Sequence, residues 1–96
     1  MRNKIRASAR GRECQIRIPG VCNSNPETTV LCHLGGGGMG AKRSDLHGAY
    51  GCSSCHDEID RRTRVVDFEH ARLLFLEGII RTQEILLNEG LINVKS

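Results

Sequence analysis

Five cysteines carry the clearest chemistry in this 96-residue chain, and two of them stand three positions apart. Cys52 and Cys55, in the run Cys-Ser-Ser-Cys-His, place two thiols at the spacing that closes half of a tetrahedral zinc site. Cys14 and Cys22 lie far enough upstream for the chain to fold back and supply the other half. Their separation is wider than in a zinc knuckle, so it requires an intervening hairpin. The sequence predicts a structural zinc site on these four cysteines.

Length and composition favour metal over disulfides. A chain of this length forms one domain with a small core, and only two Phe and one Tyr are available to fill it. Such domains depend on a metal or on disulfides, and an odd number of cysteines leaves one out of any complete disulfide set. No apolar segment suggests export or a membrane span, so we expect a cytoplasmic protein whose cysteines bind metal.

Other uses of the cysteines fit less well. The string Cys-Ser-Ser-Cys-His also matches the haem c attachment motif, but covalent haem requires export and a large apolar pocket. A Cys-x-x-Cys pair also occurs in thiol redox proteins, where a βαβ pattern surrounds it, and none is present. The fifth cysteine, Cys32, lies in the middle of a predicted strand. It is either buried or facing the active site.

Two histidines stand where they could act on a phosphodiester. His33 ends the β-branched, apolar run at 28–34, which predicts a strand, and His56 opens a helix predicted from Ser53 or Ser54 to about residue 62. A strand, a long loop and a zinc-anchored helix would bring both imidazoles into one cleft. His33, oriented by a backbone carbonyl, could act as general base on water. His56 could hold a divalent ion, with Asp60 one helical turn later as a second ligand.

The remaining elements flank this core. Residues 1–13 predict a basic arm, 14–22 a short strand and a turn at Pro19-Gly20, and 49–50 another short strand. Asp67 caps a long helix predicted from Phe68 to Asn88, with Gly90 as its stop. Beyond its core-facing residues this helix has a second apolar face, which predicts a homodimer through the helix. The alternative is that both faces lie in the core of one chain. The second face comprises Leu73, Leu76, Ile80 and Leu87.

Positive charge gathers in the first half of the chain. Residues 1–43 carry eight Lys and Arg against two acidic residues, whereas the rest carries a net charge of −3. This distribution indicates a contact with a polyanion, although a solvated arm has the same composition. The glycine run at 35–40 could let backbone amides and the two cations after it approach a phosphate, or it could be an unstructured surface loop. The predicted nucleic-acid contacts are Arg10, Arg12, Lys42 and Arg43.

The order of these motifs resembles the HNH endonucleases of the ββα-metal, treble-clef type. The likeness covers residues 12–62, and the whole chain is similar to the small nucleases that lambdoid prophages encode. It implies phosphodiester cleavage with His33 as base and His56 as ligand of a catalytic Mg²⁺ or Mn²⁺. Two family residues differ here: Cys32 stands where the family has an Asp that adds a metal ligand, so that ligand is missing or replaced, and the central Asn is absent. Asp45 or His47 is nearest to that Asn, and Asp45 is favoured because Leu follows it, as in the family.

The sequence therefore predicts an α+β protein with a zinc-stapled treble-clef core, a short β-hairpin plus a helix, and a long C-terminal helix. We expect one domain over 1–96, with an arm at 1–13, the core at 14–64 and the helix at 67–90. The predicted function is metal-dependent cleavage of DNA, with His33, Asp45 and His56 as catalytic residues. The alternative is a zinc-stabilised nucleic-acid-binding module without catalysis.

Overall fold

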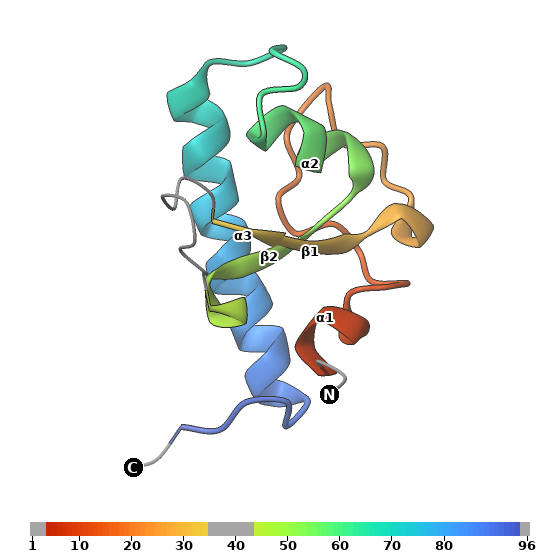
Figure 1. Cartoon of the computed structure of the whole chain (residues 1–96), viewed down its shortest axis with the longest axis vertical. Helices are drawn as coiled ribbons and strands as arrows, with labels where there is room; N and C mark the ends of the chain where they lie inside the picture. The colour runs from red at the N-terminus through yellow and green to blue at the C-terminus, as the bar shows by residue number, and fades with distance from the viewer. Residues whose placement is uncertain (1–3, 35–43, 95–96) are drawn as a thin grey trace.

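A two-stranded antiparallel hairpin packs against one long helix in the computed structural model, which describes residues 4–34 and 44–94 (Figure 1). The predicted α+β class, the hairpin and the long C-terminal helix are confirmed. The elements are the helix α1 (Lys4–Ser8), the 3-10 turn η1 (Pro26–Thr28), β1 (Val30–His33), the 3-10 turn η2 (Asp45–His47), β2 (Gly48–Gly51), α2 (Ser53–Ile59) and α3 (Phe68–Asn88).

The hairpin pairs β1 along its whole length with the buried strand β2. Val30 pairs with Gly51 at one end, and His33 pairs with Gly48 at the other. All four residues of β2 are buried between β1 and α3. The Tyr50 N–H donates to the Thr82 hydroxyl oxygen at 3.0 Å, so α3 satisfies a backbone donor that the two-stranded sheet leaves unpaired.

The long helix α3 has the predicted bounds. Its core-facing residues follow helical spacing and are Ala71, Phe75, Gly78, Ile79, Thr82 and Leu86. Gly78 allows α3 to approach the backbone of Gln15 closely, because a Cβ at position 78 would lie 3.0 Å from the Gln15 carbonyl oxygen. The helix therefore packs directly on the backbone of the segment that carries Cys14.

The strand predicted within residues 14–22 is wrong. Ile16 and Ile18 alternate along the sequence and are both fully buried, as in a strand. However, Arg17 between them has φ 54°, a left-handed conformation that reverses the chain locally. The predicted turn at Pro19-Gly20 is confirmed, and the Val21 N–H closes it on the Ile18 carbonyl at 3.0 Å.

The helix α2 is shorter than predicted and has a different cap. It ends at Ile59, and Arg61 just beyond it has φ 63°, which stops helical hydrogen bonding. Its cap is the sulfur of Cys52, which accepts the Cys55 N–H at 3.4 Å, rather than either predicted serine. Cys52, Cys55 and the start of the helix are therefore one local structure.

The connection from α2 to α3 is held by a buried carboxylate. Glu58 is fully buried and accepts the Val66 N–H at 2.8 Å and the Thr63 hydroxyl. These hydrogen bonds, the hydroxyl one first, hold the pKa of Glu58 below its usual range. Because an ionised carboxylate satisfies both donors, the turn after α2 is fixed against α3.

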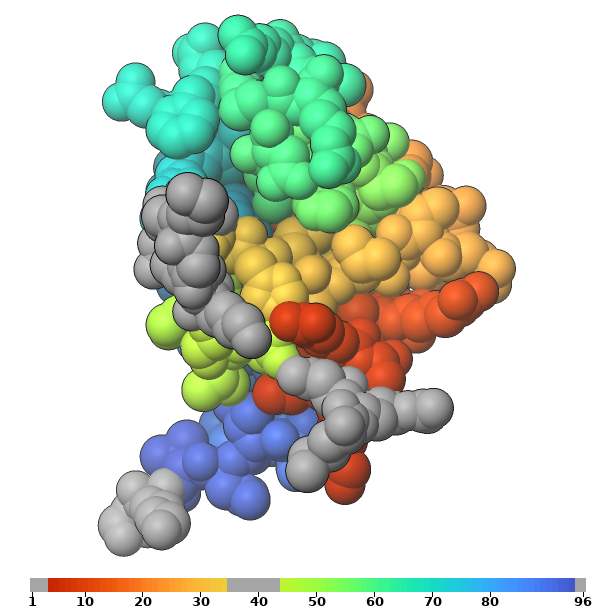
Figure 2. All heavy atoms as spheres, viewed as in Figure 1, coloured from red at the N-terminus to blue at the C-terminus, as the bar shows by residue number. Residues whose placement is uncertain are grey.

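Residues 4–13, which the sequence assigns to an arm, contact the rest of the fold. Residues 4–8 form α1, which lies beside the hairpin (Figures 1 and 2). The Ser8 and Tyr50 hydroxyls share a hydrogen bond of 2.7 Å, and Ala9 is buried. Arg12 pairs with Glu89 at the far end of the chain, with its guanidinium 5.8 Å from the centre of the Tyr50 ring. The division into arm, core and C-terminal helix remains a prediction.

A membrane span is not among these elements. Within 4–34 and 44–94, α3 is the one helix of spanning length, and it is too polar to cross a bilayer.

Candidate metal centre and active site

Four cysteines converge at one point of the fold. The sulfur atoms of Cys14, Cys22, Cys52 and Cys55 all lie within 4.8 Å of one another. Those of Cys22 and Cys52 are 3.8 Å apart, although 30 residues separate them in sequence. A tetrahedron with zinc–sulfur bonds of about 2.3 Å has sulfurs about 3.8 Å apart, so the cluster has the size of a structural zinc site. These residues could hold a metal such as zinc.

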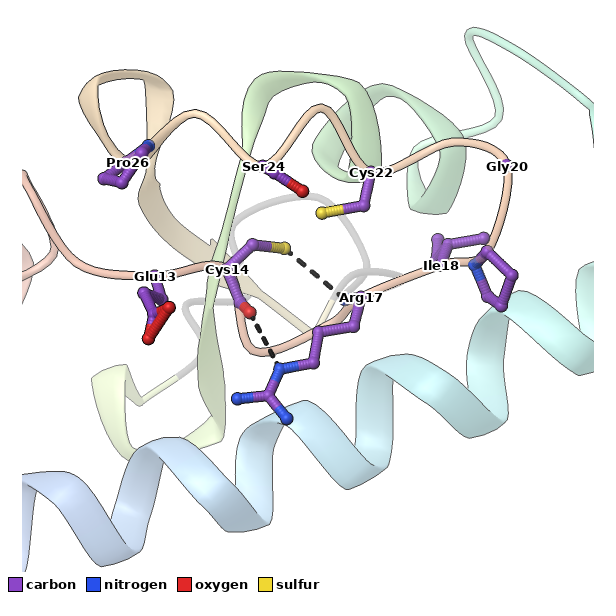
Figure 3. A pocket seen from close by; sticks show the side chains of 9 residues that line it. Glu13, Cys14, Arg17, Ile18, Gly20, Cys22, Ser24 and Pro26 are labelled. Carbon is purple, nitrogen blue, oxygen red and sulfur yellow. Dashed lines mark hydrogen bonds between the residues drawn. The ribbon is translucent and has the colours of Figure 1, made fainter.

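Backbone N–H groups around the cluster donate hydrogen bonds to two of its sulfur atoms. Cys14 and Cys22 lie on either side of the turn at Pro19-Gly20, and in Figure 3 their sulfurs point toward each other. The Arg17 N–H donates to the Cys14 sulfur and the Asn23 N–H to the Cys52 sulfur, each at 3.4 Å. Backbone donors to ligand sulfurs orient them and stabilise the thiolate form that binds metal. The left-handed conformation of Arg17 thus aims a donor at the cluster.

Within the cluster, the thiols of Cys14 and Cys55 interact strongly with each other. A hydrogen bond from the Cys55 thiol, with help from the Arg17 N–H, lowers the pKa of Cys14 to about 4. The same hydrogen bond, with burial, raises the pKa of Cys55. One sulfur of the pair therefore holds negative charge while the other keeps its proton. Four sulfurs this close can all be thiolates only with a cation between them.

Cys32 lies outside this cluster and faces the interior. Its side chain is fully buried, with the sulfur 3.8 Å from the Val30 carbonyl and 3.9 Å from the Gly51 carbonyl. Burial, followed by nearby negative groups, raises the pKa of this thiol above its usual range. The buried alternative for Cys32 is therefore correct. It does not replace the metal-binding Asp of the HNH pattern.

His33, at the end of β1, is paired with Asp45 at the start of η2. The His33 Nε2 and the Asp45 Oδ1 are 2.5 Å apart, and the Arg6 Nε donates to the same oxygen at 3.2 Å. The partner of His33 is thus a carboxylate rather than the predicted backbone carbonyl. An ionised carboxylate only accepts hydrogen bonds, so this contact suits the neutral tautomer in which Nε2 donates and Nδ1 has the lone pair. Sequence reasoning missed Arg6, because nothing distinguishes it from the other cations near the N-terminus.

His56 is paired with Asp60 along α2. The His56 Nε2 and the Asp60 Oδ2 are 3.2 Å apart, and both side chains are about one-third exposed. Two ligands at neighbouring corners of an octahedron, with bonds of about 2.1 Å, lie about 3 Å apart, so the pair matches one edge of a Mg²⁺ site. Among the described residues the cysteine tetrad is the only group of three or more potential ligands. Any further ligands here would be water or substrate oxygens, as is usual for Mg²⁺.

The two histidine–carboxylate pairs belong to neighbouring parts of the fold. In Figure 1, α2 runs back over the hairpin, so its C-terminal end lies on the same side as the end of β1 that carries His33. The negative charge of Asp60 is close enough to Cys32, the residue before His33, to help raise its pKa. His33 and His56 each interact with a different carboxylate. Whether both rings act in one cleft stays a prediction.

The predicted nucleic-acid contacts differ in their surroundings. Arg10 is exposed just after α1. Arg12 is engaged within the fold by Glu89, whose pKa it holds below the usual range through their hydrogen bond. Lys42, Arg43 and the glycine run lie outside the described residues. Of the four predicted contacts, Arg10 is therefore the one that the structure presents at the surface.

Known proteins share this sequence and this fold. A family model described as "Putative nuclease YbcO" matches residues 3–91. The chain belongs to the YbcO family. A protein of that name from Escherichia coli K12 is 58% identical over 91 residues, which cover 92% of this chain and 95% of the relative. A relative from Enterobacteria phage 82, with the same name, has the same identity and coverage.

A solved structure extends the likeness to three dimensions. It is titled "Structure of a putative bacteriophage protein from Escherichia coli str. K-12 substr. MG1655" and superposes with a TM-score of 0.81 at 57% identity. The match covers 91% of this chain and all of that chain. The names of these relatives support nuclease activity, while the HNH type stays a prediction.

The zinc hypothesis predicts that one buried cysteine is essential and another is not. Cys55→Ala should abolish zinc binding and unfold the chain, because structural zinc contributes about 10–16 kcal/mol, as much as the whole stability of a small domain. Cys32→Ala, an equally buried site outside the cluster, should retain one zinc per chain and a native circular dichroism spectrum. Metal content by atomic emission, measured beside the spectra, checks both variants.

Chelation gives the complementary measurement. Complete removal of metal from the parent protein should unfold it cooperatively, and added zinc should restore it. A metal-free protein with an unchanged spectrum would show that the sulfurs pack without needing a metal.

Proposed function

We propose that this protein is a metal-dependent endonuclease of the HNH type that hydrolyses phosphodiester bonds in cytoplasmic DNA. The observation that carries the proposal is the Asp45-paired His33 at the end of β1, beside a helix that the cysteine cluster anchors and that presents His56 and Asp60. Zinc, the hairpin and α2 together would form the treble clef of that superfamily. The nuclease names of the YbcO relatives agree with this activity.

His33 acts as the general base. Asp45 holds the Nε2 proton, so the Nδ1 lone pair accepts a proton from water. The water oxygen then forms a bond to phosphorus, and the bond from phosphorus to the leaving oxygen breaks. Asp45 also stabilises the imidazolium that results, as a carboxylate partner does for a catalytic histidine in hydrolases. Arg6, bonded to the same carboxylate oxygen, keeps Asp45 in place.

His56 and Asp60 form the candidate site for a catalytic Mg²⁺ or Mn²⁺. Such an ion, when bound, supplies positive charge that stabilises the phosphate in the transition state and the leaving oxygen. The helix sets the spacing of the two side chains, since residues four apart lie on one face. Arg62 approaches the Asp60 carboxylate at 3.8 Å, so this carboxylate lies at the end of α2 beside a cation.

A plasmid nicking assay tests this proposal. With Mg²⁺ or Mn²⁺, the zinc-loaded protein should nick supercoiled DNA, and His33→Ala should lower the rate by about 10²–10⁴-fold, the usual contribution of a general base. The variant should still bind DNA and keep its zinc, because the proposal assigns His33 to neither the zinc site nor the DNA contacts. His70→Ala removes an exposed histidine of α3 and should leave the rate unchanged.

The alternative is a zinc-stabilised nucleic-acid-binding module. It predicts that the parent and His33→Ala bind DNA equally and that neither cleaves it with any divalent metal. That result would contradict the nuclease proposal. Binding without cleavage by His33→Ala, beside cleavage by the parent, would exclude the module.

We also infer that two copies pair through α3. Its second apolar face is exposed, with Leu73, Leu76, Ile80 and Leu87 each more than one-third accessible. Leu73, Ile80 and Leu87 recur every seven residues, and Leu76 lies three after the first, which are the a and d positions of a helix-pairing seam. Four such residues in one seam are more than the scattered exposed leucines of a monomer.

Light scattering measures this pairing. The parent should give twice the chain mass of 10.6 kDa at micromolar concentration, and Ile80→Glu should give the monomer mass while keeping zinc and helix content. A parent protein with the monomer mass would contradict the dimer.

A further inference from the structure

A hollow between α1 and β1 has the size and lining of a ligand site. Its volume is about 500 Å³. Two cations, Arg6 and Arg10, stand on its α1 side, and Ala7, Val30 and Leu31 supply most of its apolar wall. Figure 2 shows the red N-terminal segment beside the orange and yellow chain of β1. Cationic groups over an apolar wall suit a ligand with an anionic end and a less polar body.

Thr29 is one of the residues that line this hollow, and it carries an unsatisfied polar atom. Its side chain is 3% exposed, and its Oγ1 has no hydrogen-bond partner within the described part of the chain. A buried hydroxyl without a partner costs about 1–3 kcal/mol, so it needs a reason. A ligand with an acceptor oxygen would satisfy it.

The hollow is linked directly to the proposed catalytic base. Arg6 lines it and also donates to the Asp45 oxygen that contacts His33. The ligand would therefore lie next to the site of cleavage. Glu27 also lines the hollow and disfavours a ligand with negative charge spread over its whole length. One phosphate on the arginine side, with a neutral sugar beyond it, meets both conditions.

We propose that this hollow is a nucleotide subsite, which binds one phosphate and its deoxyribose next to the cleaved bond. Arg6 and Arg10 bind the phosphate oxygens, the Thr29 hydroxyl donates to one of them, and the apolar wall packs on the sugar. The inference rests on the proposed nuclease function for the identity of the ligand. Its evidence, however, is a set of residues outside the His33 and His56 pairs.

Binding measurements without catalysis test this subsite. His33→Ala, zinc-loaded and without Mg²⁺ or Mn²⁺, provides a background that cannot cleave, and fluorescence anisotropy on a labelled DNA duplex gives the affinity. Arg10→Ala should weaken binding and reduce the slope of log K against log salt by about 0.9, the value for one phosphate contact. Thr29→Val keeps the side-chain shape and loses the hydroxyl. It should weaken binding about tenfold, because a hydrogen bond to a charged oxygen is lost, while the fold stays as stable as before or becomes more stable.

A double-mutant cycle supplies the control. The effects of Arg10→Ala and Thr29→Val should not add, because both residues would contact the same phosphate. Arg64→Ala removes an exposed cation after α2, and its effect should add to that of Thr29→Val. Unchanged affinity of Thr29→Val, or full additivity with Arg10→Ala, would overturn the subsite. If the parent does not nick DNA but the cycle is non-additive, the subsite stands and only the nuclease proposal fails.

Discussion

The convergence of four sulfur atoms is the constraint on which this structure depends. Two of them come from the turn around Arg17 and two from the first turn of α2. A two-stranded hairpin is marginally stable alone, and a chain of this size buries only a small core. A cation among the sulfurs would join these distant segments with a free energy comparable to the stability of a whole domain. Hairpin, turn and α2 would then be held as one rigid body.

That rigidity places the histidines. The sulfur of Cys52 both caps α2 and belongs to the cluster, so the direction of the helix that carries His56 is set within its first turn. His33 is set by strand pairing with Gly48 and by the carboxylate of Asp45. Catalytic groups need to be held to within a fraction of an ångström, and packed elements provide this better than loops. In this account the metal centre fixes the hairpin and α2, and these elements position the two histidine–carboxylate pairs.

Elements with strong periodicity could be predicted from the sequence, and those made by distant contacts could not. The bounds of α3 follow from an apolar pattern over 21 residues. The four clustered cysteines follow from their spacing and number. By contrast, α1 is five residues long and is ordered by contacts such as that of Ser8 with Tyr50. The partner of Arg12 is Glu89, 77 residues away, and no local pattern indicates it.

The candidate site shows the same division. The roles proposed for His33 and His56 follow from motif order, whereas only one of their carboxylate partners could be predicted from the sequence. Asp60 lies one turn after His56 and could be predicted from helical spacing. The contact between Asp45 and Arg6 joins residues 39 positions apart, so the sequence alone could not show that α1 reaches the site. The false strand at 16–18 arose because alternating burial does not reveal a left-handed residue such as Arg17.

The most direct test of the central claim is the coordination shell of the bound metal. Zinc-edge X-ray absorption on the purified protein should fit four sulfur ligands at about 2.3 Å, with no nitrogen or oxygen ligand in the first shell. Histidine nitrogens in that shell, or fewer than four sulfurs, would contradict the account, because the cysteines would then not be what joins the turn to the helix.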